Sequence, residues 1–303
     1  MKVFVTGATG AIGKFAVPAL VGAGHDVTGL ARTDQKAAQL DAQGARPARV
    51  SLFEPDELKD AFSGIDAVLN LATSIPSVTK AATQKSWADN ERIRREGSTN
   101  VVDAALAAGV GRVVQESITF TYPDCGAEWI DESVTPVDVP DNFGGVFVAE
   151  RNAARFTEAG GVGVVLRFAL FYGPGSSHSD LFLRAARRHI GSVAGKPKAY
   201  QSNIHLADAG TATVAALGLP AGIYNVGDDE PLTKRDYAKA VGAAVGKRPW
   251  LLLPGRWVNL GGKRSSVLTS SQRVANGKIK AASEWRPAYP SAREGWKATV
   301  DDA

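Results

Sequence analysis

A chain of 303 residues with 44% hydrophobic and 22% charged residues has the composition of a folded protein, which excludes a disordered tail protein. One cysteine excludes a disulfide framework and a thiolate-rich metal site, and with four histidines we expect no metal centre. No apolar run has the roughly 18 to 20 residues that span a bilayer, and Met1-Lys2 leads directly into Val-Phe-Val rather than into a signal-peptide core. The sequence therefore predicts a cytoplasmic protein without membrane contact.

The net charge of +4 is divided unevenly along the chain. Residues 1–149 carry 13 Lys and Arg against 19 Asp and Glu, a net charge of −6, whereas residues 150–303 carry 22 against 12, a net charge of +10. This asymmetry indicates that the second half meets an anion, either a nucleic acid or a phosphorylated small molecule. Because the basic residues are dispersed and no helix-turn-helix or aromatic–basic platform is visible, we expect a small-molecule substrate and no nucleic acid.

Strands and helices are predicted to alternate through the first 167 residues. Short apolar or β-branched runs predict strands at 2–6, 26–30, 46–52, 66–71, 112–117 and 162–167. Apolar residues at helical spacing predict helices between them, at 14–23, 35–43, 55–64, 86–108 and 147–159. This alternation is typical of a doubly wound α/β domain, with a parallel sheet and helices on both faces.

The pattern becomes less regular in two later regions. Residues 118–145 are rich in proline and glycine, which predicts a loop. After Tyr172 the predicted elements are short, at 179–189, 206–217, 222–226 and 234–245. We therefore predict a doubly wound domain over residues 1–172 and a smaller, mixed lobe over 173–303, with elements of the two interleaved.

Three glycines follow the first predicted strand, in the segment Thr6-Gly-Ala-Thr-Gly-Ala-Ile-Gly13. The first allows a tight turn, the second lets the backbone approach a pyrophosphate, and the third lets the following helix pack against the strand. The spacing differs from G-x-G-x-x-G, so a glycine turn without a ligand is the alternative, but the strand–turn–helix context favours a dinucleotide. The predicted contacts are Gly7, Thr9, Gly10, Ala11, Ile12 and Gly13.

The residue that follows the second predicted strand bears on the choice between NADP and NAD. Arg32 stands near the place where an acidic residue of an NAD-binding protein meets the ribose 2′-hydroxyl. Its guanidinium could bind a 2′-phosphate, assisted by Lys36. The alternatives are that Arg32 is merely solvated, or that Asp34 pairs with it and favours NAD. We expect NADP(H) to be preferred and NAD(H) to be possible.

Four segments resemble the extended short-chain dehydrogenase/reductase family, in its NAD-dependent epimerase/dehydratase group. They are the glycine segment, Asn70-Leu-Ala72, Leu166-Arg-Phe with Tyr172-Gly-Pro-Gly175, and the stretch from Ser271-Gln-Arg273 to Ser291-Ala-Arg-Glu-Gly295. The resemblance implies a Rossmann domain that binds NAD(P) and a C-terminal lobe that holds the substrate, often a nucleotide sugar. It also implies cofactor contacts at Ser51, Leu52, Leu71, Ala72, Thr73, Ser117 and Phe171.

The catalytic pair of this family is replaced in the chain. The family's hydride chemistry uses a tyrosine whose phenol exchanges a proton with the substrate oxygen, and a lysine four residues later that lowers the pKa of that phenol. Alignment on Ala149-Glu150 puts Asn142 in the tyrosine position and Val146 in the lysine position. Neither side chain can perform that chemistry, so the resemblance implies a divergent member.

Nearby residues are candidate replacements. Tyr122 could donate a proton if a cation lowers the pKa of its phenol, and Arg94, which aligns with a family Asn, could be that cation or bind an anion. Ile118 aligns with the family's usual Ser or Thr, and Ser117 and Thr119 flank it at the carboxyl end of a strand, where α/β sheets place ligands. The alternatives are a helix-surface cation for Arg94 and a packed loop aromatic for Tyr122.

The basic lobe offers candidate substrate contacts. Arg184 shares one face of a predicted helix with Arg187 and Arg188 and could hold a diphosphate or carboxylate, although such clusters also occur as solvated faces. His178 lies in a Ser-rich loop facing the predicted cleft. The predicted substrate contacts are Thr119, Asn142, His178 and Arg184.

The leading hypothesis is an NADP(H)-dependent enzyme that transfers hydride on a polyhydroxylated or anionic small molecule, such as a nucleotide sugar or secondary metabolite, with an unusual proton donor. One alternative is a cofactor-binding regulator without redox activity. Another is a dehydratase or cyclase that uses the fold to shape a pocket. A homodimer through the helices at 86–108 and 147–159 is an expectation from the resemblance alone.

Overall fold

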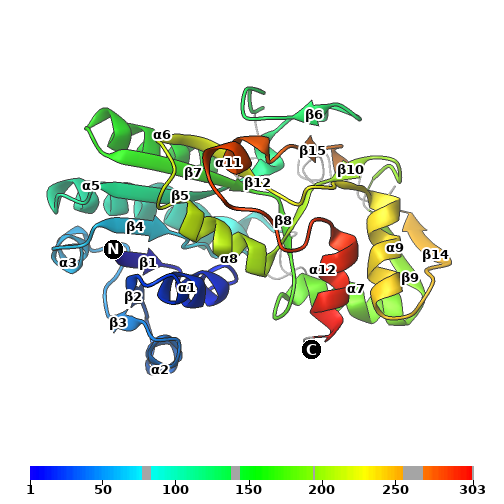
Figure 1. Cartoon of the computed structure of the whole chain (residues 1–303), viewed down its shortest axis with the longest axis horizontal. Coiled ribbons are helices and arrows are strands. Elements are labelled where there is room, and N and C mark those ends of the chain that lie inside the picture. Colours follow the sequence, from blue (N-terminus) through cyan, green and yellow to red (C-terminus); the bar gives the residue numbers. More distant parts are fainter. Residues whose placement is uncertain (77–82, 138–143, 194, 255–268, 302–303) are drawn as a thin grey trace.

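The computed structural model describes residues 1–76, 83–137, 144–193, 195–254 and 269–301 (Figure 1). Its centre is a seven-stranded sheet in which every neighbouring pair is parallel. In spatial order the strands are β12 (Gly222–Val226), β7 (Val162–Phe168), β5 (Arg112–Ile118), β4 (Ala67–Asn70), β1 (Lys2–Thr6), β2 (Asp26–Leu30) and β3 (Arg46–Ala48). The predicted doubly wound fold is confirmed, and the direction of strand addition reverses between β1 and β4.

Helices cover both faces of this sheet, so its strands are apolar on both sides. Val5 faces a core that includes α1 (Gly13–Gly22), α2 (Asp34–Ala42), α8 (Leu206–Ala215) and α11 (Gly277–Ala282). The adjacent Phe4 faces the opposite core, with α3 (Pro55–Ala61), α5 (Ser98–Ala107) and α6 (Gly145–Glu158). Because successive side chains of a strand point to opposite faces of the sheet, each strand contributes to two separate cores.

The helical segment predicted at 86–108 is not one regular helix. It consists of η1 (Gln84–Trp87), α4 (Ala88–Arg92), a π-helical turn η2 (Ile93–Gly97) and α5. A π-helical turn carries more residues per turn than an α-helix and therefore redirects the side chains around it, often at functional sites. Here the redirected residue of interest is Arg94.

The edge strand β3 ends at Ala48, earlier than the predicted end at residue 52. Its single partner, β2, ends at Leu30 opposite Ala48, so the ladder has no further partner. The backbone then turns at Ser51, whose hydroxyl accepts from Phe53 N and whose carbonyl accepts from Glu54 N.

The C-terminal half contributes to the central sheet and also builds a smaller lobe, seen on the right of Figure 1. The edge strand β12 and helix α8 both lie beyond residue 172 and yet pack in the doubly wound part. Tyr172, Tyr237 and Trp296 belong to the core of the smaller lobe. Its elements are β8 (Leu170–Tyr172), α7 (Ser177–Arg187), β9 (Ile190–Val193), β10 (Tyr200–Gln201), β11 (Asn203–His205), β13 (Leu232–Thr233), α9 (Lys234–Ala244), β14 (Leu251–Pro254) and α12 (Ala292–Asp301).

Two short elements lie among the described residues of the region predicted as loop at 118–145. They are the 3₁₀ turn η3 (Thr119–Thr121) and β6 (Trp129–Ile130), which pairs with β15 (Arg273–Val274). Within the described ranges, no helix is long and apolar enough to cross a membrane.

Candidate active site

The glycine segment forms a tight loop between β1 and α1. Gly7 has a φ of +66°, and a Cβ at this position would lie 2.5 Å from the carbonyl oxygen of Leu71. A Cβ at Gly13 would lie 2.3 Å from the carbonyl oxygen of Gly7. The loop thus has no room for side chains at these two positions, because α1 starts directly against the strand end. This is the cradle that a dinucleotide pyrophosphate requires at a helix N-terminus.

A chain of buried amides fixes the strand ends around this cradle. Thr6 Oγ1 donates to Asn70 Oδ1 at 2.6 Å, and Asn70 Nδ2 donates to Gln115 Oε1 at 2.8 Å. These residues are register partners on β1, β4 and β5, at the carboxyl ends of the strands. The strand ends at the point of reversal, where doubly wound proteins bind their ligands, are therefore linked by hydrogen bonds.

The residues with predicted cofactor contacts collect at the same edge. Leu71 follows β4 and is the residue that Gly7 approaches, and half-buried Ala72 and Thr73 come next in the chain. Ser51 and Leu52 follow β3, and the carbonyl of Leu52 accepts from Asn100 Nδ2 at 2.9 Å. These residues fit a dinucleotide that runs from the β3 end across the glycine cradle toward β5.

Phe171 lies in β8, whose parallel partner is β11. Its ring contacts that of Phe168 at the end of β7, with centroids 5.3 Å apart. A position beyond β7 is the one that the family resemblance implies for the nicotinamide end of the cofactor.

Arg32, after β2, is exposed to solvent. The carboxylate of Asp34 pairs with Arg49, which follows β3, rather than with Arg32. Lys36 lies in the first turn of α2, where its backbone N–H donates to the hydroxyl of Thr33 at 3.3 Å. The carboxylate that could have paired with Arg32 is therefore paired with another arginine, and the guanidinium of Arg32 is exposed beside it.

Two buried arginine–glutamate pairs stand at the carboxyl ends of β5 and β7. Arg167 donates to both oxygens of Glu150 on α6, at 2.8 and 2.6 Å, and Ser117 also donates to Glu150. Arg94 approaches both oxygens of Glu116, at 2.9 and 2.7 Å. Each of the four charged side chains is at most 9% exposed. Arg94 is therefore not a helix-surface cation.

Tyr122 is 2% exposed, and its phenol is held by two protein groups. It donates to Asn225 Oδ1 at 2.9 Å and accepts from Arg167 Nη1 at 3.0 Å. The cation beside this phenol is thus Arg167. The sequence suggested Arg94 for this role, but Arg94 is paired with Glu116 instead. Burial raises the pKa of Tyr122 despite the arginine, so the phenol stays protonated at neutral pH.

The positions aligned with the family's catalytic residues contain no proton donor among those that the structure describes. Val146, in the lysine position, is a fully buried residue of α6. Ile118, in the Ser or Thr position, is 7% exposed, and Thr119 in η3 is 1% exposed. Asn142 lies outside the described residues.

The candidate substrate residues of the basic lobe have different surroundings. Arg184 is exposed on α7, as are Arg187 and Arg188. His178 instead donates from Nε2 to the carbonyl of Phe171, and its Nδ1 lies 2.8 Å from the hydroxyl of Ser176. Burial lowers the pKa of His178, which favours the neutral ring.

The sequence reasoning did not single out Glu116, Glu150, Arg167 or Asn225 as site residues. A signal was present for two of them, because Arg167 is the one charged residue in the otherwise apolar β7 and Glu116 is a charged residue in the buried part of β5. Burial of such charges requires partners. The partners, however, are 17 to 22 residues away in sequence, and only the fold reveals them.

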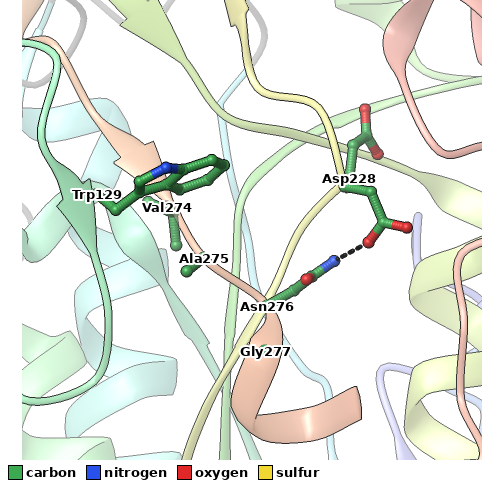
Figure 2. A pocket seen from close by; sticks show the side chains of 7 residues that line it. Trp129, Asp228, Val274, Ala275, Asn276 and Gly277 are labelled. Carbon is green, nitrogen blue, oxygen red and sulfur yellow. Dashed lines mark hydrogen bonds between the residues drawn. The ribbon is translucent and has the colours of Figure 1, made fainter.

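A separate pocket of about 360 Å³ lies beyond the carboxyl end of β12 (Figure 2). Its walls come from β6, the segment after β12, and β15 with the start of α11. Asn276 Nδ2 donates to Asp229 Oδ1 at 2.7 Å along one wall. Its lining residues are Trp129, Asp228, Asp229, Val274, Ala275, Asn276 and Gly277, none of which the sequence predicted as a site residue.

The fold and the glycine cradle define a dinucleotide-binding α/β protein. Comparisons with known proteins identify its family. The sequence profile described as "NAD dependent epimerase/dehydratase family" matches residues 3–227. A 3-diazoavenalumate denitrifying reductase from a Streptomyces species is 30% identical over 312 residues, which cover 97% of this chain and 99% of that protein. The chain belongs to the NAD-dependent epimerase/dehydratase family and is an NAD(P)-dependent oxidoreductase or epimerase.

Solved structures agree in fold. The UDP-glucose 4-epimerase of Thermotoga maritima, solved with UDP-glucose, superposes with a TM-score of 0.80 at 21% identity, covering 99% of this chain and 98% of that chain. The human epimerase family protein SDR39U1, solved with NADPH, has a TM-score of 0.80 at 22% identity and covers the full length of both chains. The predicted Rossmann architecture and family resemblance are confirmed.

Proposed function

We propose that this enzyme is an NADP(H)-dependent reductase that transfers hydride to carbon in a small organic anion carrying a diazo group. The observation that carries the proposal is a retained cofactor cradle beside an altered catalytic centre, in which buried Val146 takes the place of the family lysine. The full-length similarity to a denitrifying reductase of a diazo carboxylate supports the substrate class. The +10 charge of the C-terminal half fits an anion.

The chemistry of nitrogen loss explains why the Tyr–Lys pair is dispensable. When bound, reduced NADP supplies the hydride. At a diazonium carbon, that electron pair forms the new C–H bond, while the C–N bond breaks and its electrons leave with dinitrogen. No alkoxide is formed, so no protein group must protonate a substrate oxygen. Reduction of a carbonyl, by contrast, requires such a proton.

The chain's own residues then have limited tasks. Gly7, Gly10 and Gly13 admit the pyrophosphate, Leu71 to Thr73 line the middle of the cofactor, and Phe171 lies toward the nicotinamide. Ser117, Tyr122 and Thr119 stay predictions as catalytic or substrate residues, as do His178 and Arg184. The division at residue 172 and the homodimer also stay predictions.

The proposal predicts a strong preference for a diazonium over a carbonyl in the same molecule. We expect 4-hydroxy-3-diazoniobenzoate to be reduced with a kcat/KM on the order of 100-fold above that of 4-hydroxy-3-formylbenzoate, since an absent general acid commonly costs a factor of 10² to 10⁴. Both reactions are followed by NADPH consumption, with product and dinitrogen measured by mass spectrometry. Reactions without enzyme give the background rate.

Two outcomes contradict the proposal. Equal rates with the aldehyde and the diazonium would show that the enzyme retains a proton donor. Tight NADPH binding without reduction of either compound would favour a cofactor-binding regulator or a non-redox enzyme instead.

Arg32 is proposed to select NADP through the 2′-phosphate. Replacing Arg32 with alanine is expected to weaken NADPH binding about 10- to 100-fold and to leave NADH binding within about twofold, because a hydrogen bond to a charged group contributes about 1.5 to 3 kcal/mol. Fluorescence titration with NADPH and with NADH gives the ratio of the two dissociation constants. Arg46→Ala is the matched control, since Arg46 is an exposed arginine at the opposite end of β3, paired with Asp26. An unchanged NADPH:NADH ratio in Arg32→Ala would overturn the assignment.

A further inference from the structure

Arg94 is a buried cation that retains an unused hydrogen-bond donor. Its side chain is 3% exposed, and one guanidinium nitrogen, Nη2, makes both contacts to Glu116. The other, Nη1, is buried and has no hydrogen-bond partner within the described part of the chain. A buried unsatisfied donor costs free energy, more so on a charged group, and calls for a physical reason.

The surroundings of Arg94 place this buried side chain beside the carboxyl ends of β4 and β5. One helical turn earlier, Asn90 Oδ1 accepts from the backbone N–H of Ser74, directly after the predicted cofactor segment 71–73. The partner carboxylate, Glu116, is next to Ser117 at the carboxyl end of β5. Arg94 therefore lies between the β4 loop and the β5 end, where the middle and nicotinamide parts of the cofactor are proposed to bind.

Helix α6 closes the third side. A Cβ on Gly145 would lie 2.9 Å from Cβ of Arg94, so the first turn of α6 packs directly on the arginine stem. The carboxylate of Glu91 accepts from the N–H of Gly145 at 2.9 Å and pairs with Arg95 at 3.0 Å, which fixes α4 and η2 against this turn. The same turn contains Val146, the position aligned with the family lysine.

The charge balance at this point admits a second anion when Glu116 takes up a proton. The Arg94–Glu116 pair is neutral, and burial and the neighbouring Glu150 carboxylate both raise the pKa of Glu116. Protonation of Glu116 when another anion arrives is therefore less costly than for an exposed carboxyl. The arginine would then balance the charge of the incoming group.

From these contacts we propose that Arg94 binds an anionic oxygen of the substrate through Nη1, with Glu116 holding the guanidinium in place. The inference rests on the proposed function, since it assumes a small anion at the nicotinamide end. Arg94 thereby determines substrate specificity. It supplies a positive charge to an active site in which Val146 replaces the family lysine. Glu116 is a positioning residue.

The test needs variants that remain folded. Removing one member of a buried ion pair leaves the other charge unpaired, whereas replacing both members is often tolerated. The main variant is therefore Arg94→Gln with Glu116→Gln, which removes both charges while keeping polar groups of similar size. Arg94→Lys retains a point charge but loses the planar fork. Arg92→Gln is the matched control, because Arg92 is an exposed arginine at the end of α4, two residues before Arg94, and is paired with Glu96.

The probe is 4-hydroxybenzoate, an aromatic carboxylate without a diazo group, and its methyl ester is the uncharged counterpart. Calorimetric titration of each compound into the NADP⁺-loaded protein measures its dissociation constant. We expect the wild type and Arg92→Gln to bind the carboxylate at least tenfold more tightly than the ester, and the double variant to lose this discrimination while binding NADPH within about twofold of wild type. Arg94→Lys is expected to retain part of the discrimination between carboxylate and ester.

The outcomes separate this inference from the proposed function. If the double variant still discriminates carboxylate from ester as the wild type does, Arg94 has only a structural role and the inference is wrong. If the wild type reduces the diazonium compound but its KM is unchanged in the double variant, the inference also fails while the proposed function stands. If the wild type reduces neither test compound, the proposed function itself fails.

Discussion

Replacing Gly13 with alanine is expected to abolish cofactor binding and to destabilise the fold by about 3 kcal/mol, at the upper end of what overpacking commonly costs. The new Cβ would lie 2.3 Å from the carbonyl oxygen of Gly7 and 2.4 Å from backbone atoms of Ala8, and backbone cannot move aside as a flexible side chain can. The start of α1 must then shift away from β1. A misplacement of about 1 Å can cost an enzyme on the order of 100-fold in rate. We expect a loss of NADPH affinity of at least that size, because the loop that admits the pyrophosphate moves with α1.

Urea unfolding and fluorescence titration measure the two effects separately. Gly22→Ala is the matched control, because Gly22 ends the same helix and a Cβ there meets no atom within 4 Å. We expect Gly22→Ala to bind NADPH as the wild type does and to be equally or slightly more stable. If Gly13→Ala bound NADPH normally, the glycine loop would not be the cofactor cradle.

Replacing Arg167 with methionine is expected to cost about 3 to 5 kcal/mol of unfolding free energy, the range measured when one partner of a buried ion pair is removed. Glu150, at 9% exposure, would keep its charge in the interior, with Ser117 as the one remaining side-chain donor among the residues that the structure describes. Tyr122 would lose the donor to its phenol at the same time.

The double variant Arg167→Met with Glu150→Leu distinguishes an unpaired charge from lost packing. Because both charges are then absent, we expect it to recover most of the lost stability, to within about 1 to 2 kcal/mol of wild type. Chemical denaturation of the wild type, both single variants and the double variant gives the coupling free energy. A double variant as unstable as Arg167→Met would show that packing and the Tyr122 contact, rather than the unpaired carboxylate, dominate.

The doubly wound fold could be predicted because each element has a local signal. β1 and β2 have the predicted bounds, since apolar runs in buried parallel strands end abruptly at glycine or polar residues. β3 was predicted too long because its end depends on where its partner β2 stops, which is not a local property. The helix at 86–108 was predicted as regular because the apolar spacing does not reveal a π-helical turn.

The cofactor side of the candidate site could be predicted for the same reason. The glycine loop is a contiguous segment whose residue types follow from steric limits, since a Cβ added at Gly7 or Gly13 would lie only 2.3 to 2.5 Å from a backbone oxygen. The catalytic side of the site could not be predicted from the sequence, because its groups come from separate strands and helices. The sequence suggested Arg94 as the cation beside Tyr122. Because β7 lies directly beside β5 in the sheet, Arg167 takes that place, and Arg94 pairs with Glu116 instead.

Deuterium transfer from NADPH labelled at nicotinamide C4 tests the central claim most directly. The enzyme is incubated in ordinary water with 4-hydroxy-3-diazoniobenzoate and each of the two C4-deuterated epimers of NADPH, and the 4-hydroxybenzoate formed is examined by mass spectrometry. We predict one deuterium at the carbon that lost dinitrogen, from only one of the two epimers. Product without deuterium from both epimers would contradict hydride transfer by this protein.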